Sequence, residues 1–123
     1  MLPALADPFD TDADINERAR AYLHTNCSGC HRPNGGTVVD IDLRYSTALQ
    51  NTNACDVSPQ LGGLGLANPR IIATGDAARS VVVERMSRRD SMSIGMPPIG
   101  STVVDAAGVS LMTEWINGLT GCQ

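Results

Sequence analysis

Two cysteines and a histidine stand close together early in the chain, in the run Cys27-Ser28-Gly29-Cys30-His31. Two thiols three positions apart on one helical turn reach two neighbouring points of one large ligand, and the imidazole that follows offers a nitrogen to a metal. This C-x-x-C-H spacing is the attachment pattern for a c-type haem. We therefore expect one haem c, bound covalently through Cys27 and Cys30, with His31 as an axial iron ligand.

A C-x-x-C pair also serves thiol redox enzymes and forms half of many zinc sites. A thiol redox motif normally follows a β-strand, whereas the residues before Cys27 are rich in alanine and arginine and favour a helix. A zinc site needs two further ligands at close spacing, but the remaining cysteines, Cys55 and Cys122, stand far apart. Thiol redox chemistry is the main alternative to haem attachment.

A six-coordinate haem iron needs a second axial ligand. Met96 lies in Gly95-Met96-Pro97-Pro98, where two prolines fix an extended backbone that can hold a weak thioether ligand over the iron. We predict Met96 as this ligand, with Met92 in the same loop as its competitor. The other candidates are better explained elsewhere: Met86 and Met112 as core residues on helix faces, and His24 as a surface histidine.

Further residues are predicted to line the cofactor. Leu64, Leu66 and Ile71 supply apolar side chains around the stretch Gly62-Gly63, where the backbone can pass close to a haem face. Arg70 and Arg89 are the candidates for propionate binding, because a guanidinium donates two hydrogen bonds to one carboxylate. For each arginine, exposure without a specific contact is an equal alternative. Pro97, beside Met96, completes the predicted cofactor-binding residues.

The two cysteines outside the C-x-x-C-H run are expected to pair. In an oxidising compartment the simplest fate of Cys55 and Cys122 is a disulfide, and two unpaired thiols are the alternative. This bridge would tie the end of the chain to its middle.

Hydrophobic periodicity and capping residues predict three helices. The first covers residues 14–25, with Thr11 or Asp12 as N-cap. The second begins after Gly75, with Asp76 as N-cap, and runs towards Ser87. The third starts at Asp105 and is amphipathic. Residues 32–74 and 90–104 are rich in Gly, Pro, Asn and Ser and are predicted to be loops, with a short helical turn near residues 44–49.

The length of 123 residues suits one domain with one hydrophobic core, covering residues 1–123 with a linker-like arm at 1–11. One Phe, two Tyr and one Trp give few large side chains to fill this core, so a porphyrin would supply apolar bulk. The net charge of −4 argues against nucleic acid binding. No lysine is present, so any cation at a docking surface is arginine.

No apolar run approaches the roughly 20 residues that span a bilayer, and the first six residues are too short for a complete signal peptide. Haem is attached covalently outside the bacterial cytoplasmic membrane. We therefore expect a periplasmic, secreted or cell-surface location, either after removal of an export signal or, as we favour, as a module of a longer secreted protein.

The order of these features resembles the small monohaem class I cytochrome c family. It comprises C-x-x-C-H after an N-terminal helix, a Gly-rich loop, Met96-Pro97-Pro98 and a C-terminal helix with an aromatic residue. The resemblance implies an all-α, cytochrome c-like fold with three main helices and long loops around one haem, and a crossing of the first and last helices near Trp115. The segment of residues 35–70 is longer than the corresponding segment of the short family members. The stretch from Asn68 onward is similar to cytochrome modules of secreted bacterial proteins of carbohydrate and polysaccharide oxidation.

The expected function is electron transfer rather than enzymatic catalysis. A haem ligated by histidine and methionine passes single electrons between a donor and an acceptor, such as a dehydrogenase or a copper oxygenase, and needs no substrate site. The resemblance to cytochrome modules suggests this type of redox partner, and a monomer is expected. The alternative is a peroxidase-like enzyme or gas sensor with an open distal haem site. A peroxidase needs a distal acid or base, and the sequence offers no evident one.

Overall fold

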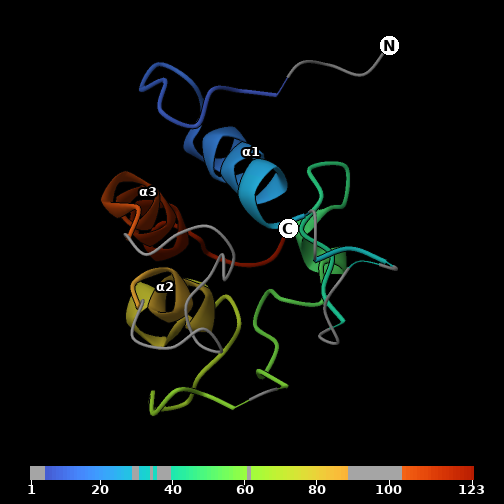
Figure 1. Cartoon of the computed structure of the whole chain (residues 1–123), viewed down its shortest axis with the longest axis vertical. Coiled ribbons are helices and arrows are strands. Elements are labelled where there is room, and N and C mark those ends of the chain that lie inside the picture. The colour runs from blue at the N-terminus through green and yellow to red at the C-terminus, as the bar shows by residue number, and fades with distance from the viewer. Residues whose placement is uncertain (1–4, 29–30, 34, 36–39, 61, 89–103) are drawn as a thin grey trace.

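The structure, a computed structural model, describes residues 5–28, 31–33, 35, 40–60, 62–88 and 104–123. Within these ranges the chain forms three α-helices: α1 (Ile15–Cys27), α2 (Val81–Met86) and α3 (Ala106–Asn117). Two short 3-10 helices, η1 (Leu49–Asn51) and η2 (Ala77–Arg79), lie between α1 and α2, and the described residues contain no β-strand (Figure 1). The predicted all-α class is confirmed. None of the described helices is long and apolar enough to cross a membrane.

Helices α1 and α3 pack against each other, and two side-chain hydrogen bonds join them. The Trp115 indole donates from Nε1 to Asn16 Oδ1 at 3.1 Å. The Tyr22 hydroxyl donates to Asp105 Oδ2 at 2.7 Å. Trp115 is almost fully buried at 2% exposure. The predicted position of Trp115 at the contact of the first and last helices is therefore confirmed.

The two long helices begin at capping aspartates. Asp105, where the third helix was predicted to start, is the N-cap of α3 and accepts a hydrogen bond from the Gly108 N–H at 3.0 Å. The predicted cap of the first helix was wrong, because Asp14, not Thr11 or Asp12, caps α1 through the Glu17 N–H. The acidic arm offers several residues of the right type, and the sequence pattern does not distinguish among them.

The predicted second helix is interrupted. Ser80 has an extended backbone (φ −91°, ψ 115°), so η2 ends before it and α2 begins after it. The Ser80 side chain is buried, accepts from the Ala73 N–H at 2.8 Å and donates to the Asp76 carbonyl at 3.0 Å. Asp76, the predicted N-cap of this helix, stands at the N-cap position of η2. Its side chain makes no capping hydrogen bond and instead forms an ion pair with Arg79. The predicted turn near residues 44–49 corresponds to η1, which begins only at Leu49.

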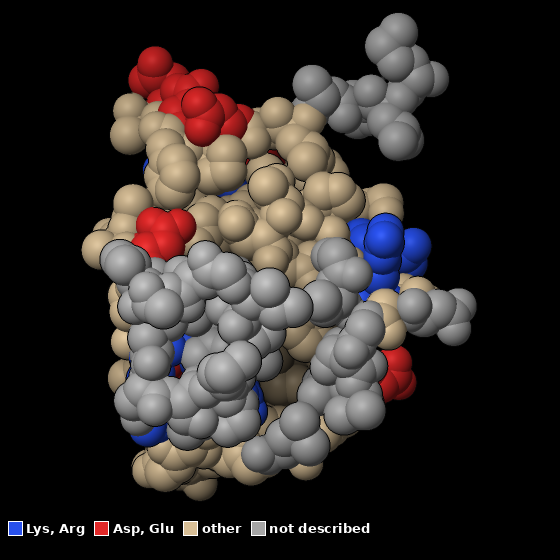
Figure 2. Space-filling view, in the orientation of Figure 1, with Lys and Arg blue, Asp and Glu red and all other residues tan. Residues whose placement is uncertain are grey.

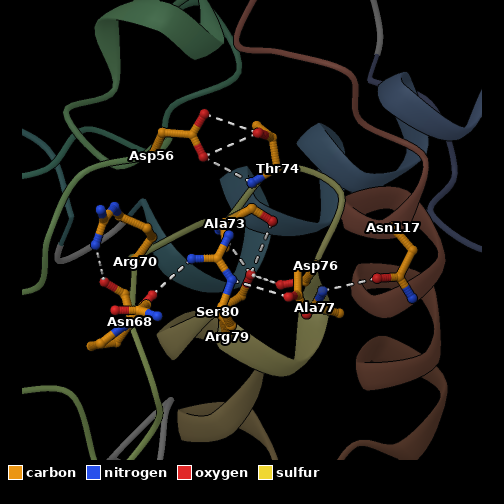
Figure 3. A network of polar contacts seen from close by, with 11 residues as sticks. Asp56, Asn68, Arg70, Ala73, Thr74, Asp76, Ala77, Arg79, Ser80 and Asn117 are labelled. Atoms are coloured by element: carbon orange, nitrogen blue, oxygen red, sulfur yellow. Dashed lines mark hydrogen bonds and ion pairs between the residues drawn. The ribbon is translucent and has the colours of Figure 1, made fainter.

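Hydrogen bonds fix the segment before α2 to two other parts of the molecule (Figure 3). The Ala77 N–H donates to Asn117 Oδ1 at the end of α3. The Thr74 N–H and hydroxyl both donate to the Asp56 carboxylate. This segment therefore connects the end of α3 to the loop that contains Asp56, which lies 18 residues before Thr74 in the chain.

The hydrophobic core lies between α1, α3 and the loops that follow α1. Met86 and Met112 are buried in it, as predicted. The disulfide Cys55–Cys122 is present, with the Cα atoms 5.9 Å apart, so this prediction is also confirmed. It joins the tail after α3 to the middle of the chain.

The described part of the N-terminal arm contacts α1. The Phe9 ring lies edge-on against the Tyr22 ring, with centroids 6.2 Å apart. Arg18 donates from Nε to the Pro8 carbonyl at 2.9 Å. Figure 2 shows acidic side chains gathered at this end of the molecule. From residue 5 on, the arm is therefore held against the first helix.

The glycine at position 108 is required by the contact between α1 and α3. A Cβ atom at Gly108 would lie 2.2 Å from the Tyr22 hydroxyl oxygen and 2.4 Å from its Cζ. We expect Gly108→Ala to destabilise the protein by about 2 kcal/mol, although alanine is the better helix former by about 1 kcal/mol. Gly121→Ala is the matched control, since its Cβ meets no atom within 4 Å. Urea unfolding of both variants measures the effect, and equal stability would contradict this packing.

Removal of the disulfide has a calculable cost. The bridge closes a loop with a sequence separation of 67. On the chain-entropy estimate this constraint contributes about 4 kcal/mol, so we expect Cys55→Ser/Cys122→Ser to lower the free energy of unfolding by up to that amount. Denaturant unfolding under non-reducing conditions tests this. A double variant as stable as the parent chain would show that the bridge adds nothing.

Candidate functional site

Cys27 is the last residue of α1, and the helix end is well fixed. The next residue, Ser28, is buried, and its N–H donates to the Leu23 carbonyl at 3.1 Å. Its hydroxyl donates to the His24 carbonyl at 2.5 Å. Cys27 is half-buried and packs against the hydrophobic core. The helix therefore delivers one thiol of the C-x-x-C-H run to the edge of the core.

The backbone holds His31 close to Cys27. The His31 N–H donates to the Cys27 carbonyl at 2.9 Å. The His31 carbonyl accepts from the Leu43 N–H at 2.8 Å, and Leu43 is itself a buried core residue. Two parts of the chain therefore fix the histidine backbone from opposite sides.

The imidazole of His31 has an unsatisfied nitrogen. Its Nδ1 atom is buried and has no hydrogen-bond partner. Burial lowers the pKa of His31, and the positive charge of Arg85 in α2 lowers it further. The ring is therefore neutral around pH 7 and retains a lone pair. A buried, neutral imidazole without a hydrogen-bond partner is suited to bind a metal ion.

The loop after His31 is clamped onto α1 by residues that the sequence analysis did not single out. The buried Arg20 donates from Nη2 to the carbonyls of Arg44 and Thr47. His24 accepts a hydrogen bond at Nδ1 from the Tyr45 N–H, 3.0 Å away. His24 is half-buried and takes part in this contact, which its interpretation as a surface histidine did not include. The spacing of Arg20 and His24, four residues apart on one helix face, was the only signal.

Within the clamped loop, Asp42 forms a strong ion pair. Arg44 donates to its two carboxylate oxygens at 2.9 and 2.7 Å, and the Thr47 hydroxyl donates at 2.8 Å. These hydrogen bonds, those from Arg44 above all, hold the pKa of Asp42 far below its usual range. Elsewhere, the Tyr22 hydroxyl and the Gly108 N–H lower the pKa of Asp105.

Because the pKa values of Asp42 and Asp105 are lowered, we expect the free energy of unfolding to decrease in acid. Their pKa values are lower in the folded chain than in the unfolded chain, so the folded state binds fewer protons. Their stabilisation is complete above the unfolded value of about 3.9 and is lost as the pH falls towards the folded value. Because the Arg44 side chain is partly exposed and solvent screens the pair, we expect Asp42 to account for a loss of less than about 1 kcal/mol between pH 5 and pH 3.

Urea unfolding of the parent chain and of Asp42→Asn at pH 7, 5 and 3 measures this loss. The difference in unfolding free energy between the two chains should be largest at pH 7 and smaller at pH 3. A difference that does not change with pH would contradict the assigned role of Asp42.

Of the other described residues that were predicted to line the cofactor, only Ile71 is buried in the core that Cys27 contacts. Leu64 and Leu66 are half-buried in the glycine-rich loop. Arg70 donates from Nη1 to the carbonyl of its neighbour Pro69 at 2.8 Å. The positive charge of Arg85 acts on His31, and the sequence analysis did not single out this residue. Cys30, Arg89, Met92, Met96 and Pro97 lie outside the described residues.

An apolar groove of about 420 Å³ lies at the other end of α1. It is lined by Ile15 and Asn16 of the first turn and by Trp115 and Leu119 at the end of α3. Ile15 and Cys27 are the first and last residues of α1, which places them about 18 Å apart along the helix axis. The groove is therefore separate from the Cys27–His31 site.

Comparisons of the chain with models of protein families, with curated proteins and with solved structures found no match.

Proposed function

We propose that this protein is an electron-transfer domain that carries one haem c. Cys27 and Cys30 attach the haem, His31 is one axial ligand and Met96 is the other. The observation that carries the proposal is the His31 imidazole, whose Nδ1 is buried without a partner in a residue whose N–H donates to the Cys27 carbonyl. A metal ion bound by this ring would make its burial favourable.

The described residues fit such a cofactor. A thiol and a neutral imidazole are placed together at the edge of an apolar core, by the end of α1 and by the hydrogen bond from Leu43. When bound, the haem supplies a one-electron redox centre whose potential depends on its axial ligands and on nearby charge. In this protein, the Arg20 and His24 contacts hold the loop after His31 in place, and Arg85 provides a positive charge that acts on the ring.

The positions of the two histidines favour electron transfer over peroxidase chemistry. A peroxidase needs an acid or base at the open side of the iron. His24, one of the two histidines in the sequence, already accepts a hydrogen bond from Tyr45 with its Nδ1, and the other histidine is the proposed iron ligand. Neither is available as a distal base.

Mixing the ferric protein with hydrogen peroxide and a phenolic electron donor tests this distinction. An electron-transfer domain should oxidise the donor no faster than free haem does, and it should show one reversible one-electron couple in voltammetry. Rapid multiple turnover would support the enzymatic alternative and overturn the proposal.

The proposed partners are redox proteins that donate to and accept from the haem. The chain carries a net charge of −4, so a basic docking surface on the partner is expected to accelerate association at low salt. Stopped-flow reduction by a basic donor protein should slow as the ionic strength rises. A rate that does not depend on salt would exclude electrostatic docking. We also propose a periplasmic or secreted location, because the Cys55–Cys122 disulfide is stable under oxidising conditions.

A further inference from the structure

A second group of reactive side chains lies where the tail after α3 meets the middle of the chain. Cys55, Asp56 and Cys122 each offer a potential metal-ligating atom, and these atoms lie within 4.8 Å of one another. The two sulfur atoms are joined in the disulfide. Cys122 Sγ lies 3.7 Å from Asp56 Oδ2. The proposed haem site uses none of these residues.

One ligand pair in this group already has the spacing of a tetrahedral zinc site, whereas the two sulfur atoms are bonded to each other and separate when the disulfide is reduced. Zinc binds thiolate sulfur at about 2.3 Å and carboxylate oxygen at about 2.1 Å, so two such ligands at the tetrahedral angle lie about 3.6 Å apart. The observed distance between Cys122 Sγ and Asp56 Oδ2 is 3.7 Å. Sulfur and carboxylate are therefore already at coordination distance from each other.

The backbone around Cys55 and Asp56 is firmly held. Cys55 forms a parallel β-bridge with Ile72, and the Asp56 N–H donates to the Ile72 carbonyl at 2.7 Å. Asp56 has a left-handed backbone (φ 58°), which turns the chain at this position. Its side chain consequently lies on the same side as Cys55, facing the tail that carries Cys122.

The carboxylate is also oriented by a neighbour. Thr74 donates to Asp56 from its N–H at 2.9 Å and from its hydroxyl at 2.9 and 3.1 Å (Figure 3). Outer hydrogen bonds of this kind fix the direction of a metal-ligating carboxylate and raise its affinity. Asp56 is exposed, so a cation can reach it from solvent and a water molecule can fill a fourth position.

We propose that the reduced chain binds one Zn²⁺ through Cys55, Asp56 and Cys122, with water as the fourth ligand. A dithiol reductant cleaves the Sγ–Sγ bond by supplying two electrons and two protons, and is itself converted to a disulfide. Zn²⁺ then displaces both thiol protons and binds the two thiolates. The oxidised chain has no thiolate at this position and does not form the site.

The C-terminal tail that carries Cys122 is consequently linked to Cys55 in both redox states. The disulfide links them in the oxidised chain, and the bound metal ion links them in the reduced chain. This inference does not depend on the proposed haem or on electron transfer.

Zinc binding by the full-length chain tests the proposal. The chain and its Cys122→Ser variant are reduced with a phosphine without air, incubated with Zn²⁺, separated from free metal by gel filtration and analysed by mass spectrometry of the metal. The reduced parent chain should retain one zinc more per molecule than Cys122→Ser. The difference isolates this site, because any zinc at an unmodified Cys27–Cys30 pair is common to both chains.

Two carboxylate variants test the third ligand. Asp56→Asn should weaken zinc binding at least tenfold in competition with a chelator, whereas Glu114→Gln, an equal charge change at an exposed position of α3, should leave it unchanged. Equal zinc content in the reduced parent and Cys122→Ser would overturn the proposal, and so would extra zinc in the oxidised parent. An Asp56→Asn variant that binds zinc as tightly as the parent would overturn the three-ligand site.

Discussion

Cys27→Ala/Cys30→Ala is expected to abolish covalent haem attachment completely and to leave a chain without a cooperative unfolding transition. Of the four aromatic residues in the sequence, only Tyr22 and Trp115 are buried, while Phe9 is half exposed. The protein therefore has little large apolar volume of its own. Without the cofactor, the buried His31 Nδ1 also remains unsatisfied, at a cost of about 1–3 kcal/mol.

The matched control removes the other two cysteines. Cys55→Ser/Cys122→Ser lowers the cysteine content equally but leaves the C-x-x-C-H run intact, so it should retain its haem. Intact mass spectrometry and thermal unfolding followed by circular dichroism measure attachment and folding separately. Haem retained by the Cys27/Cys30 double variant, or its cooperative unfolding at the temperature of the parent, would contradict the proposed role of the cofactor.

Met96→Ala is expected to change the iron site more than any other single substitution outside the C-x-x-C-H run. Loss of the thioether leaves the sixth position open, so the reduced protein should bind carbon monoxide rapidly and the reduction potential should fall markedly. The weak near-infrared band of a sulfur-ligated ferric haem should disappear. Visible and near-infrared spectra with voltammetry record all three changes.

Met92→Ala is the matched control, because it removes an identical side chain four positions away in the same predicted loop. It should retain the near-infrared band and resist carbon monoxide. If Met92→Ala loses the band and Met96→Ala keeps it, the ligand is Met92. If neither variant changes, methionine ligation is wrong.

Elements set by local chemistry could be predicted from the sequence. The third helix was predicted from the capping Asp105 and from apolar residues at helical spacing, and both are present. The disulfide was predicted by elimination once two of four cysteines were assigned to haem. The first helix was also predicted from pattern alone, although it was expected to end at residue 25 and it continues to Cys27.

Features that depend on tertiary contacts could not be predicted. Nothing in the run from Asp76 to Ser87 shows that Ser80 is extended, because the break depends on its hydrogen bonds with Ala73 and Asp76. The effect of Arg85 on His31 could not be predicted for the same reason. Arg85 lies far from His31 in the sequence, and only the folded chain brings its charge close enough to lower the pKa of the histidine.

The contacts between α1 and the loop after His31 could not be predicted from the sequence either. Arg20 is charged and lies in a helix, so sequence alone favours exposure. It is nevertheless 6% exposed, because the loop carbonyls of Arg44 and Thr47 accept its hydrogen bonds. A long, glycine-rich loop can follow many paths, and only the folded chain shows which carbonyls meet this guanidinium.

The most direct test of the central claim is the absorption spectrum of the purified protein in the oxidised state, in the reduced state and in the reduced state under carbon monoxide. The account predicts a c-type reduced spectrum, a weak near-infrared band in the oxidised protein and no change on adding carbon monoxide. Absence of a haem spectrum from a chain produced with a haem-attachment system would contradict haem attachment. Rapid formation of a carbon monoxide complex would contradict His31/Met96 ligation and favour an open-site enzyme or sensor.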